Sequence, residues 1–145
     1  MLKYRLVTDI AQEFADFVPS INLPVLPSSV FIPIPLHPSR LRDRGFNQAE
    51  VLGKLLARRL HIPLRTDILR RVKKTTPQVE MKDRKERLRN MKNIFEINPA
   101  TIEQWNNKTI ILFDDVFTTG ATMRAAGETL KRAGAKRVWA LTMAR

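Results

Sequence analysis

The residues from Ile111 to Met123, ILFDDVFTTGATM, combine side chains that could bind a sugar phosphate. Three apolar residues at the start of this run are followed by the adjacent carboxylates Asp114 and Asp115 and, after Val116 and Phe117, by a turn rich in threonine. Carboxylates accept hydrogen bonds from vicinal hydroxyls or help to hold a divalent cation. The first N–H groups of a helix that begins after the turn would attract a phosphate. The pattern therefore indicates a ligand with a phosphate at one end and a polyol in the middle, such as ribose 5-phosphate.

Each fragment of this run also has a simpler explanation. Two acids after a strand can form a solvated turn, and Thr-Thr-Gly can simply cap a helix. Together, in this order and between a strand and a helix, they favour a functional loop. Gly120 permits close approach of the backbone, and the threonine hydroxyls add hydrogen-bond donors. The five glycines form neither G-x-G-x-x-G nor G-x-x-x-x-G-K, so dinucleotide and P-loop nucleotide sites lack support.

The elements around the loop predict how it is positioned. Residues 109–113, TIILF, are typical of a strand buried on both faces of a parallel sheet. A helix over about 121–133, closed by Gly134, and a strand over 137–143 complete a strand–helix–strand unit. Ligands of such sheets bind beyond the carboxyl ends of the strands, where the two acids lie. The predicted fold class is α/β, an open, mostly parallel twisted sheet with flanking helices.

The rest of the chain predicts further elements of one domain over 1–145. Its core is expected at 30–145, after an N-terminal helix and connector at 1–29, and a flexible basic segment is expected at 73–90. Asn47 is predicted to cap a helix that ends near residue 60. The other predicted elements are a helix at 4–18, a strand at 30–34, a basic strand-to-helix loop at 35–46, a weak strand at 67–72, a mobile loop at 73–82, a polar helix at 82–92, an edge strand at 94–97 and a short helix starting at Pro99.

Composition excludes several classes of site. The chain has 145 residues, enough for one domain with a core, and no cysteine, which excludes disulfides, thiolate zinc sites and cysteine nucleophiles. Its two histidines, His37 and His61, are too far apart in sequence to suggest a metal cluster. No apolar run approaches the roughly 20 residues of a membrane span. The N-terminus lacks the apolar region of a signal peptide, so we expect a cytoplasmic protein without a membrane span.

The charge of the chain indicates an anionic partner. It has 26 basic and 14 acidic residues, a net charge of +12, which favours nucleic acid or phosphorylated small molecules. Residues 70–92 contain ten basic and three acidic side chains. A solvated helix face with an adjoining loop explains such a run about as well as an anion site does.

Two resemblances narrow the function. ILFDDVFTTGAT resembles the motif with which type I phosphoribosyltransferases bind phosphoribosyl pyrophosphate (PRPP). Together with PIPLHPSRLRDRGFNQA at 33–49 and TTPQ at 75–78, it resembles the ComF/GntX-type competence proteins in order and spacing, over nearly the whole chain. Those proteins carry a Cys-rich module before this region, so we expect either a short relative or a truncated chain.

The resemblance implies roles for particular residues. Asp114 and Asp115 would bind the ribose hydroxyls. Mg²⁺ would be held through PRPP rather than by the protein alone. The hood over the nucleobase is short, so the resemblance does not define the acceptor. The other implied sites are a cradle for the 5′-phosphate at Thr118, Thr119, Gly120, Ala121 and Thr122, a pyrophosphate loop with Leu36, His37 and Arg44, and a flexible loop with Lys74, Gln78 and Arg84.

Three functions remain open at this point. The first is an enzyme that transfers phosphoribosyl from PRPP to a nitrogen nucleophile. No general base stands out for it, and His37 could equally be a packing residue. The second is a basic accessory protein that binds single-stranded DNA or other competence proteins, with strong salt dependence. Most of its ten aromatic residues occupy core-like positions, so no stacking platform is evident. The third is a partner-binding module that only retains the fold. The sequence does not predict the oligomeric state.

Overall fold

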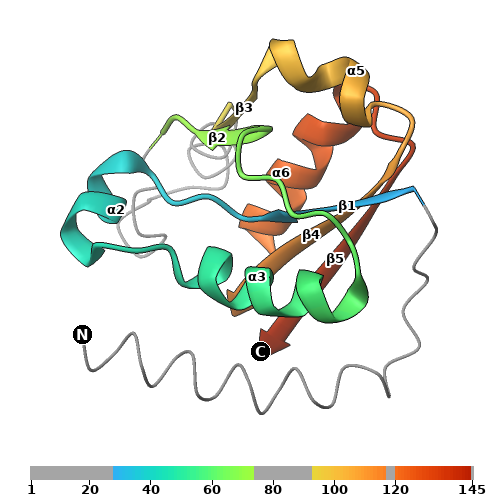
Figure 1. Cartoon of the computed structure of the whole chain (residues 1–145). Coiled ribbons are helices and arrows are strands. Elements are labelled where there is room, and N and C mark those ends of the chain that lie inside the picture. The colour runs from blue at the N-terminus through green and yellow to red at the C-terminus, as the bar shows by residue number, and fades with distance from the viewer. Residues whose placement is uncertain (1–27, 74–92, 117–119, 145) are drawn as a thin grey trace.

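A three-stranded parallel sheet forms the centre of the protein. The computed structural model describes residues 28–73, 93–116 and 120–144 (Figure 1). In it, β1 (Ser29–Pro33), β4 (Thr109–Val116) and β5 (Arg137–Ala144) pair in the order β1-β4-β5, and both pairings are parallel. The predicted α/β fold with an open parallel sheet is therefore confirmed.

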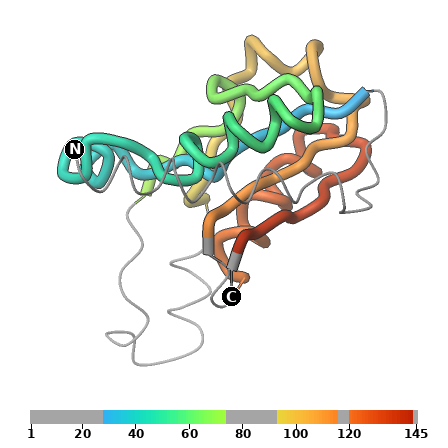
Figure 2. The backbone as a smooth tube through the Cα atoms, turned by 60° about the horizontal axis from the view of Figure 1, so that its bottom comes forward, coloured from blue at the N-terminus to red at the C-terminus, as the bar shows by residue number. Residues whose placement is uncertain are grey.

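Two helices cover opposite faces of this sheet (Figures 1 and 2). Alternate residues of a strand point to opposite faces, and β4 is apolar on both. On one face, Ile111 and Phe113 pack with α3 (Gln48–Leu60); on the other, Ile110 and Leu112 pack with α6 (Ala121–Arg132). The helix predicted to end near residue 60 and the helix predicted over about 121–133 are confirmed, and Met123, Ala126 and Leu130 of the second helix are buried.

A small hairpin-like unit lies beside α6. The strands β2 (Leu69–Arg71) and β3 (Phe95–Ile97) pair antiparallel, and β3 leads into η3 (Pro99–Thr101) and α5 (Ile102–Trp105). Trp105 is fully buried in the same core as α6, and its Nε1 donates a hydrogen bond to Thr101 Oγ1 at 3.0 Å. The strands expected near 67–72 and 94–97 and the helical start at Pro99 are confirmed.

The prediction that residues 35–46 form a loop is wrong in part, because this region contains a short helix, α2 (Pro38–Arg44). The His37 side chain caps it by accepting a hydrogen bond from the Ser39 N–H at 3.2 Å, Pro38 stands in its first turn, and Gly45 closes it at φ 82°. Proline at the start and glycine just past the end are the usual asymmetry of a helix, so the sequence contained this signal.

Other predicted elements fall outside the described residues: the N-terminal helix at 4–18, most of its connector, and nearly all of the loop and polar helix at 73–92. Within the described residues, no helix is long and apolar enough to cross a membrane.

Candidate functional site

The carboxyl end of β4 places two carboxylates side by side in the sheet. The strand runs beyond its predicted end to Val116, so Asp114 and Asp115 belong to its last residues, and Asp114 pairs in register with Thr142 of β5. Both side chains are half-buried, and the Asp115 N–H donates to Asp114 Oδ1 at 2.9 Å. Such a pair offers several oxygen acceptors close together, as a vicinal diol or a hard cation requires.

The pKa of Asp114 is raised to about 7. Burial is the largest cause, followed by the hydrogen bond and the negative charge of Asp115. Two acids that share a site do not ionise independently, because the second charge is repelled by the first. The pair therefore holds a proton near neutral pH when no cation or ligand is present.

A buried arginine that no sequence motif singled out acts electrostatically on this pair. Arg71 of β2 is 7% exposed, and its guanidinium lies over the ring of Phe95, 5.5 Å from the ring centroid. Its positive charge partly offsets the rise in the pKa of Asp114. The pKa of Arg71 itself is lowered by burial and by the positive charge of Arg40. In the sequence Arg71 is only one of ten basic residues between 70 and 92, so nothing in the pattern separated it from exposed neighbours.

The helix that follows the two acids begins at the predicted glycine. Gly120 has φ 76° and ψ 0°, the left-handed conformation, and is the N-terminal cap of α6 without a side-chain hydrogen bond. Ala121 and Thr122 form the first turn of this helix, where the macrodipole favours an anion. Thr118 and Thr119 lie outside the described residues. The described part of the predicted phosphate cradle is thus the start of a helix of normal length beside the carboxylates.

The predicted pyrophosphate loop lies at the same edge of the sheet. The Ile34 N–H donates to the Phe113 carbonyl at 2.7 Å, and Asn47 Nδ2 donates to the Ile34 carbonyl at 3.0 Å. These bonds hold the chain that leads into Leu36 next to the end of β4. His37 serves as the cap of α2, and Arg44 is exposed in the last turn of that helix.

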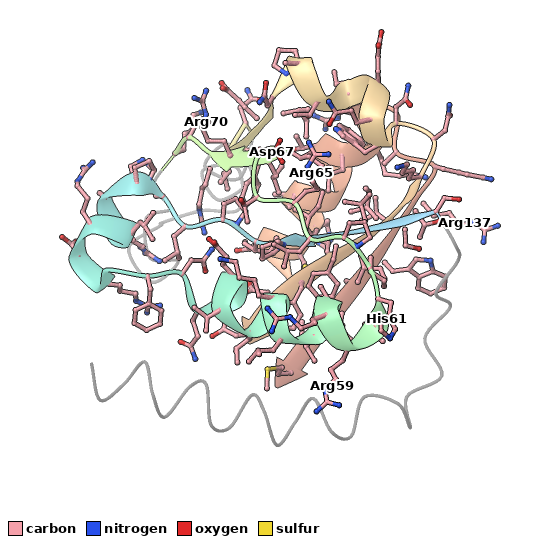
Figure 3. The ribbon with its side chains drawn as sticks, viewed as in Figure 1. Arg59, His61, Arg65, Asp67, Arg70 and Arg137 are labelled. Carbon is pink, nitrogen blue, oxygen red and sulfur yellow. The ribbon has the colours of Figure 1, made fainter. Side chains whose placement is uncertain are left out.

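A cavity of about 700 Å³ separates α2 from the β2–β3 pair. Leu36 and Arg71 both line it, together with Asn47 and the exposed Leu41. Arg70 of β2 forms an ion pair with Glu96 of β3 at 2.9 Å. Nearby, Arg65 forms an ion pair with Asp67 at 2.7 Å (Figure 3). The hydrogen bond from Arg65 lowers the pKa of Asp67.

The flexible-loop residues Lys74, Gln78 and Arg84 lie outside the described residues, between β2 and β3 in the chain. No cluster of three or more His, Cys, Asp or Glu side chains in the described ranges could hold a metal ion. The chemistry of the Asp114–Asp115 pair fits Mg²⁺, which prefers one or two carboxylates together with phosphate oxygens of a ligand.

Comparisons with known proteins agree with this geometry. A family model described as the phosphoribosyl transferase domain matches residues 47–145. Competence protein F of Haemophilus influenzae is 36% identical over 121 residues, which are 82% of this chain and 52% of that protein. Competence protein ComFC of Bacillus subtilis is 34% identical over 134 residues, 91% of this chain and 51% of that protein. The chain therefore spans about half the length of the curated relatives it matches, and the resemblance to ComF-type proteins is confirmed.

Solved structures support the fold. The glutamine PRPP amidotransferase from B. subtilis, in complex with ADP and GMP, superposes with a TM-score of 0.57 at 14% identity. The superposition covers 97% of this chain and 26% of that one. At this identity the similarity establishes the arrangement of the sheet and helices, and nothing about ligands.

Proposed function

Because this chain belongs to the phosphoribosyl transferase domain family, we propose that it binds PRPP at the carboxyl end of β4 and transfers its phosphoribosyl group to an acceptor. One observation carries the proposal: the half-buried Asp114–Asp115 pair, at the end of β4, lies a few residues before a helix that starts after a left-handed glycine. Sugar hydroxyls and a phosphate are the groups that these two features bind in combination.

Each part of the site has a role in the proposal. Asp114 and Asp115 accept hydrogen bonds from the ribose hydroxyls. The turn from Thr118 to Thr122 holds the 5′-phosphate. Leu36, His37 and Arg44 border the pyrophosphate, and Lys74, Gln78 and Arg84 are proposed to contact the bound PRPP as well. These assignments follow the family motif, and the position of Asp114 and Gly120 at one edge of the sheet supports them.

Mg²⁺ is the proposed cofactor. When bound, it supplies positive charge that stabilises the pyrophosphate as it leaves C1′. The protein's own contribution is to orient the ribose through its two carboxylates and to exclude water through the loops around the site. We also propose Arg71 as a positioning residue, because its buried charge favours the ionised form of Asp114.

A thermal-shift titration with PRPP and Mg²⁺ tests this function. Ligand at ~100 times its Kd adds about 2.7 kcal/mol to the native state, a rise in Tm of roughly 5–10 °C for a chain of this length. The matched control is the isosteric double variant Asp114→Asn/Asp115→Asn, which keeps the shape of the pair and loses its charge. A shift in the parent that disappears in the variant supports the proposal, and an equal shift in both contradicts it.

A second candidate is an accessory role in DNA uptake, in contact with single-stranded DNA or other competence proteins. The net charge of +12 favours it, and both relatives described above are named as competence proteins. Fluorescence anisotropy with a dT oligonucleotide should then show affinity that falls steeply between 50 and 200 mM salt. Affinity that does not change with salt would contradict an electrostatic mode.

A further inference from the structure

The outer strand of the sheet has an open edge. Among the described residues, β5 pairs only with β4, over a register that runs from Arg137 to Ala144 (Figures 1 and 2). Its sequence, RVWALTMA, contains one charge and no proline. Natural edge strands are usually shortened, bent, charged or covered, because their backbone groups otherwise pair with other chains. A long, apolar strand without these features is suited to receive another strand.

The opposite edge of the sheet is closed. The segment at 63–65 runs along β1, where the Phe31 N–H donates to the Pro63 carbonyl and the Arg65 N–H donates to the Phe31 carbonyl, both at 2.9 Å. Leu64 forms a parallel bridge with Phe31. The open edge at β5 is therefore a local property of this side and not a general feature of the sheet.

On the α6 side of β5 there is a shallow hollow of about 650 Å³. Its floor includes Leu112 of β4 and Val138 and Ala140 of β5, and Gly127 of α6 forms part of its wall. Ala140 is exposed, and Val138 is only partly buried. The apolar surface between helix and strand is thus incompletely covered.

On the α3 side, the same strand exposes a tryptophan. Trp139 is 44% exposed and lies in register with Ile111, which is buried under α3. Leu141 and Met143, two and four residues further along β5, are partly buried on this face. A strand added outside β5 would send alternate side chains to both faces. One set would fill the hollow and the other would cover Trp139.

The rim of the hollow is basic. Its charged side chains are Arg124, Lys131, Arg132, Arg137 and Glu128. The single acid is already paired with Arg132 at 3.7 Å. Figure 3 shows the Arg137 side chain extending outward from β5. A second copy of this chain would bring a like-charged rim against this one, whereas acidic side chains would be attracted to it.

We propose that the open edge of β5 binds an extended, acidic segment of a partner protein by β-strand addition. Backbone hydrogen bonds along β5 hold the segment. Its apolar side chains alternate between the hollow beside α6 and the surface of Trp139, and its acidic side chains contact Lys131, Arg132 and Arg137. This one occupant explains the edge that no described strand pairs, the hollow and the exposed tryptophan, which also lines the hollow.

The test begins with a displayed library of random 12-residue peptides, selected against the whole chain. We expect a consensus with alternating β-branched or aromatic residues and added Asp or Glu. The strongest peptide is then synthesised, and its Kd is measured by fluorescence anisotropy.

Two substitutions locate the binding. Ala140→Glu places a carboxylate in the hollow at an exposed position and should weaken peptide binding at least tenfold. Arg132→Glu should weaken it about fivefold, as expected for one rim charge. The matched control is Arg58→Glu, since Arg58 is likewise an exposed arginine in the last turn of a helix, α3, on the other face. It should leave the Kd unchanged.

Other outcomes would overturn the proposal. They are a library without consensus, or peptides that bind the Ala140→Glu variant as well as the parent. Light scattering that finds a dimer in the parent and a monomer in Ala140→Glu would assign the edge to a second copy. Loss of dT-oligonucleotide binding in that variant, without peptide binding by the parent, would assign it to nucleic acid. The PRPP-induced shift in Tm should be the same in all these variants, so failure of the PRPP site and failure of the edge are distinguishable.

Discussion

The carboxyl end of β4 and the outer edge of β5 contrast in how they hold charge. At the carboxyl end, Asp114 is half-buried, and the buried Arg71 acts on it across a medium that screens weakly. At the edge, Arg132 and Arg137 are exposed to solvent, and salt screens them. The difference teaches that the electrostatics of the first region depend on a few buried groups. Binding at the second region would instead depend on buried apolar area, backbone hydrogen bonds and several weakly acting charges.

Of the changes within these two regions, we expect the largest effect on how the stability of the protein depends on pH. The folded-state pKa of Asp114 is about 7, above its ordinary value of 3.8. Between about pH 4 and pH 7 the unfolded chain releases a proton that the native state keeps, so stability falls as pH rises. Asp114→Asn removes this loss, and above pH 7 we expect it to be more stable than the parent by about 2 kcal/mol after discounting for solvent screening.

Thermal unfolding of the two proteins from pH 4 to pH 8 measures this effect. The difference in Tm between variant and parent should be near zero at pH 4 and should grow to roughly 5 °C by pH 8. A difference that stays constant over this range would show that burial does not raise the pKa of this carboxyl.

The next effect is on ligand affinity. If the ribose is bound by ionised carboxylates, the proton on Asp114 must leave first, and affinity for PRPP should be about tenfold weaker at pH 6 than at pH 8. Isothermal titration calorimetry measures this ratio. Asp114→Asn is the control, because it should bind PRPP weakly and its affinity should change much less between pH 6 and pH 8. The remaining change in the variant reports the titration of the PRPP phosphates alone.

A smaller effect is expected at the start of α6. Gly120→Ala forces a side chain into the left-handed conformation, which costs about 1 kcal/mol and should lower Tm by roughly 3 °C. Gly127→Ala is the comparison, since the nearest atom to an added Cβ there lies at 3.7 Å, an ordinary contact. Gly127→Ala should keep Tm or raise it, because alanine favours a helix. Equal losses in both variants would contradict a special role for Gly120.

The smallest effect is expected at the outer edge. Trp139→Ser should change the free energy of unfolding by less than about 0.5 kcal/mol, as for other surface substitutions. Trp105→Ala is the contrasting change, because Trp105 is fully buried and its truncation should cost about 3–5 kcal/mol. Urea denaturation of both variants gives the two values. A large loss in the Trp139 variant would mean that this side chain supports the fold itself.

Much of the fold could be predicted from local patterns. The continuous apolar run at 109–113, the stripe of Met123, Ala126 and Leu130, and Gly134 after the helix each depend on neighbours in sequence. Their periods are properties of the strand and the helix themselves, so they survive in the structure. The helix at Pro38–Arg44 was not predicted, because residues 35–46 were assigned to the connection between a strand and the helix capped by Asn47, although Pro38 and Gly45 marked its ends.

The candidate site divides in the same way. The sequence by itself determined that Asp114, Asp115 and Gly120 stand where a buried strand ends and a helix begins, because residues close in sequence cannot be separated by folding. Only the tertiary structure decided that the charge of Arg71, more than 40 residues earlier in the chain, acts on Asp114, and that Trp105 is buried while Trp139 is exposed. These facts depend on which of the described elements lie side by side and on which described strand stands at the edge of the sheet. Local residue patterns do not encode that arrangement, since it results from the packing of the whole chain.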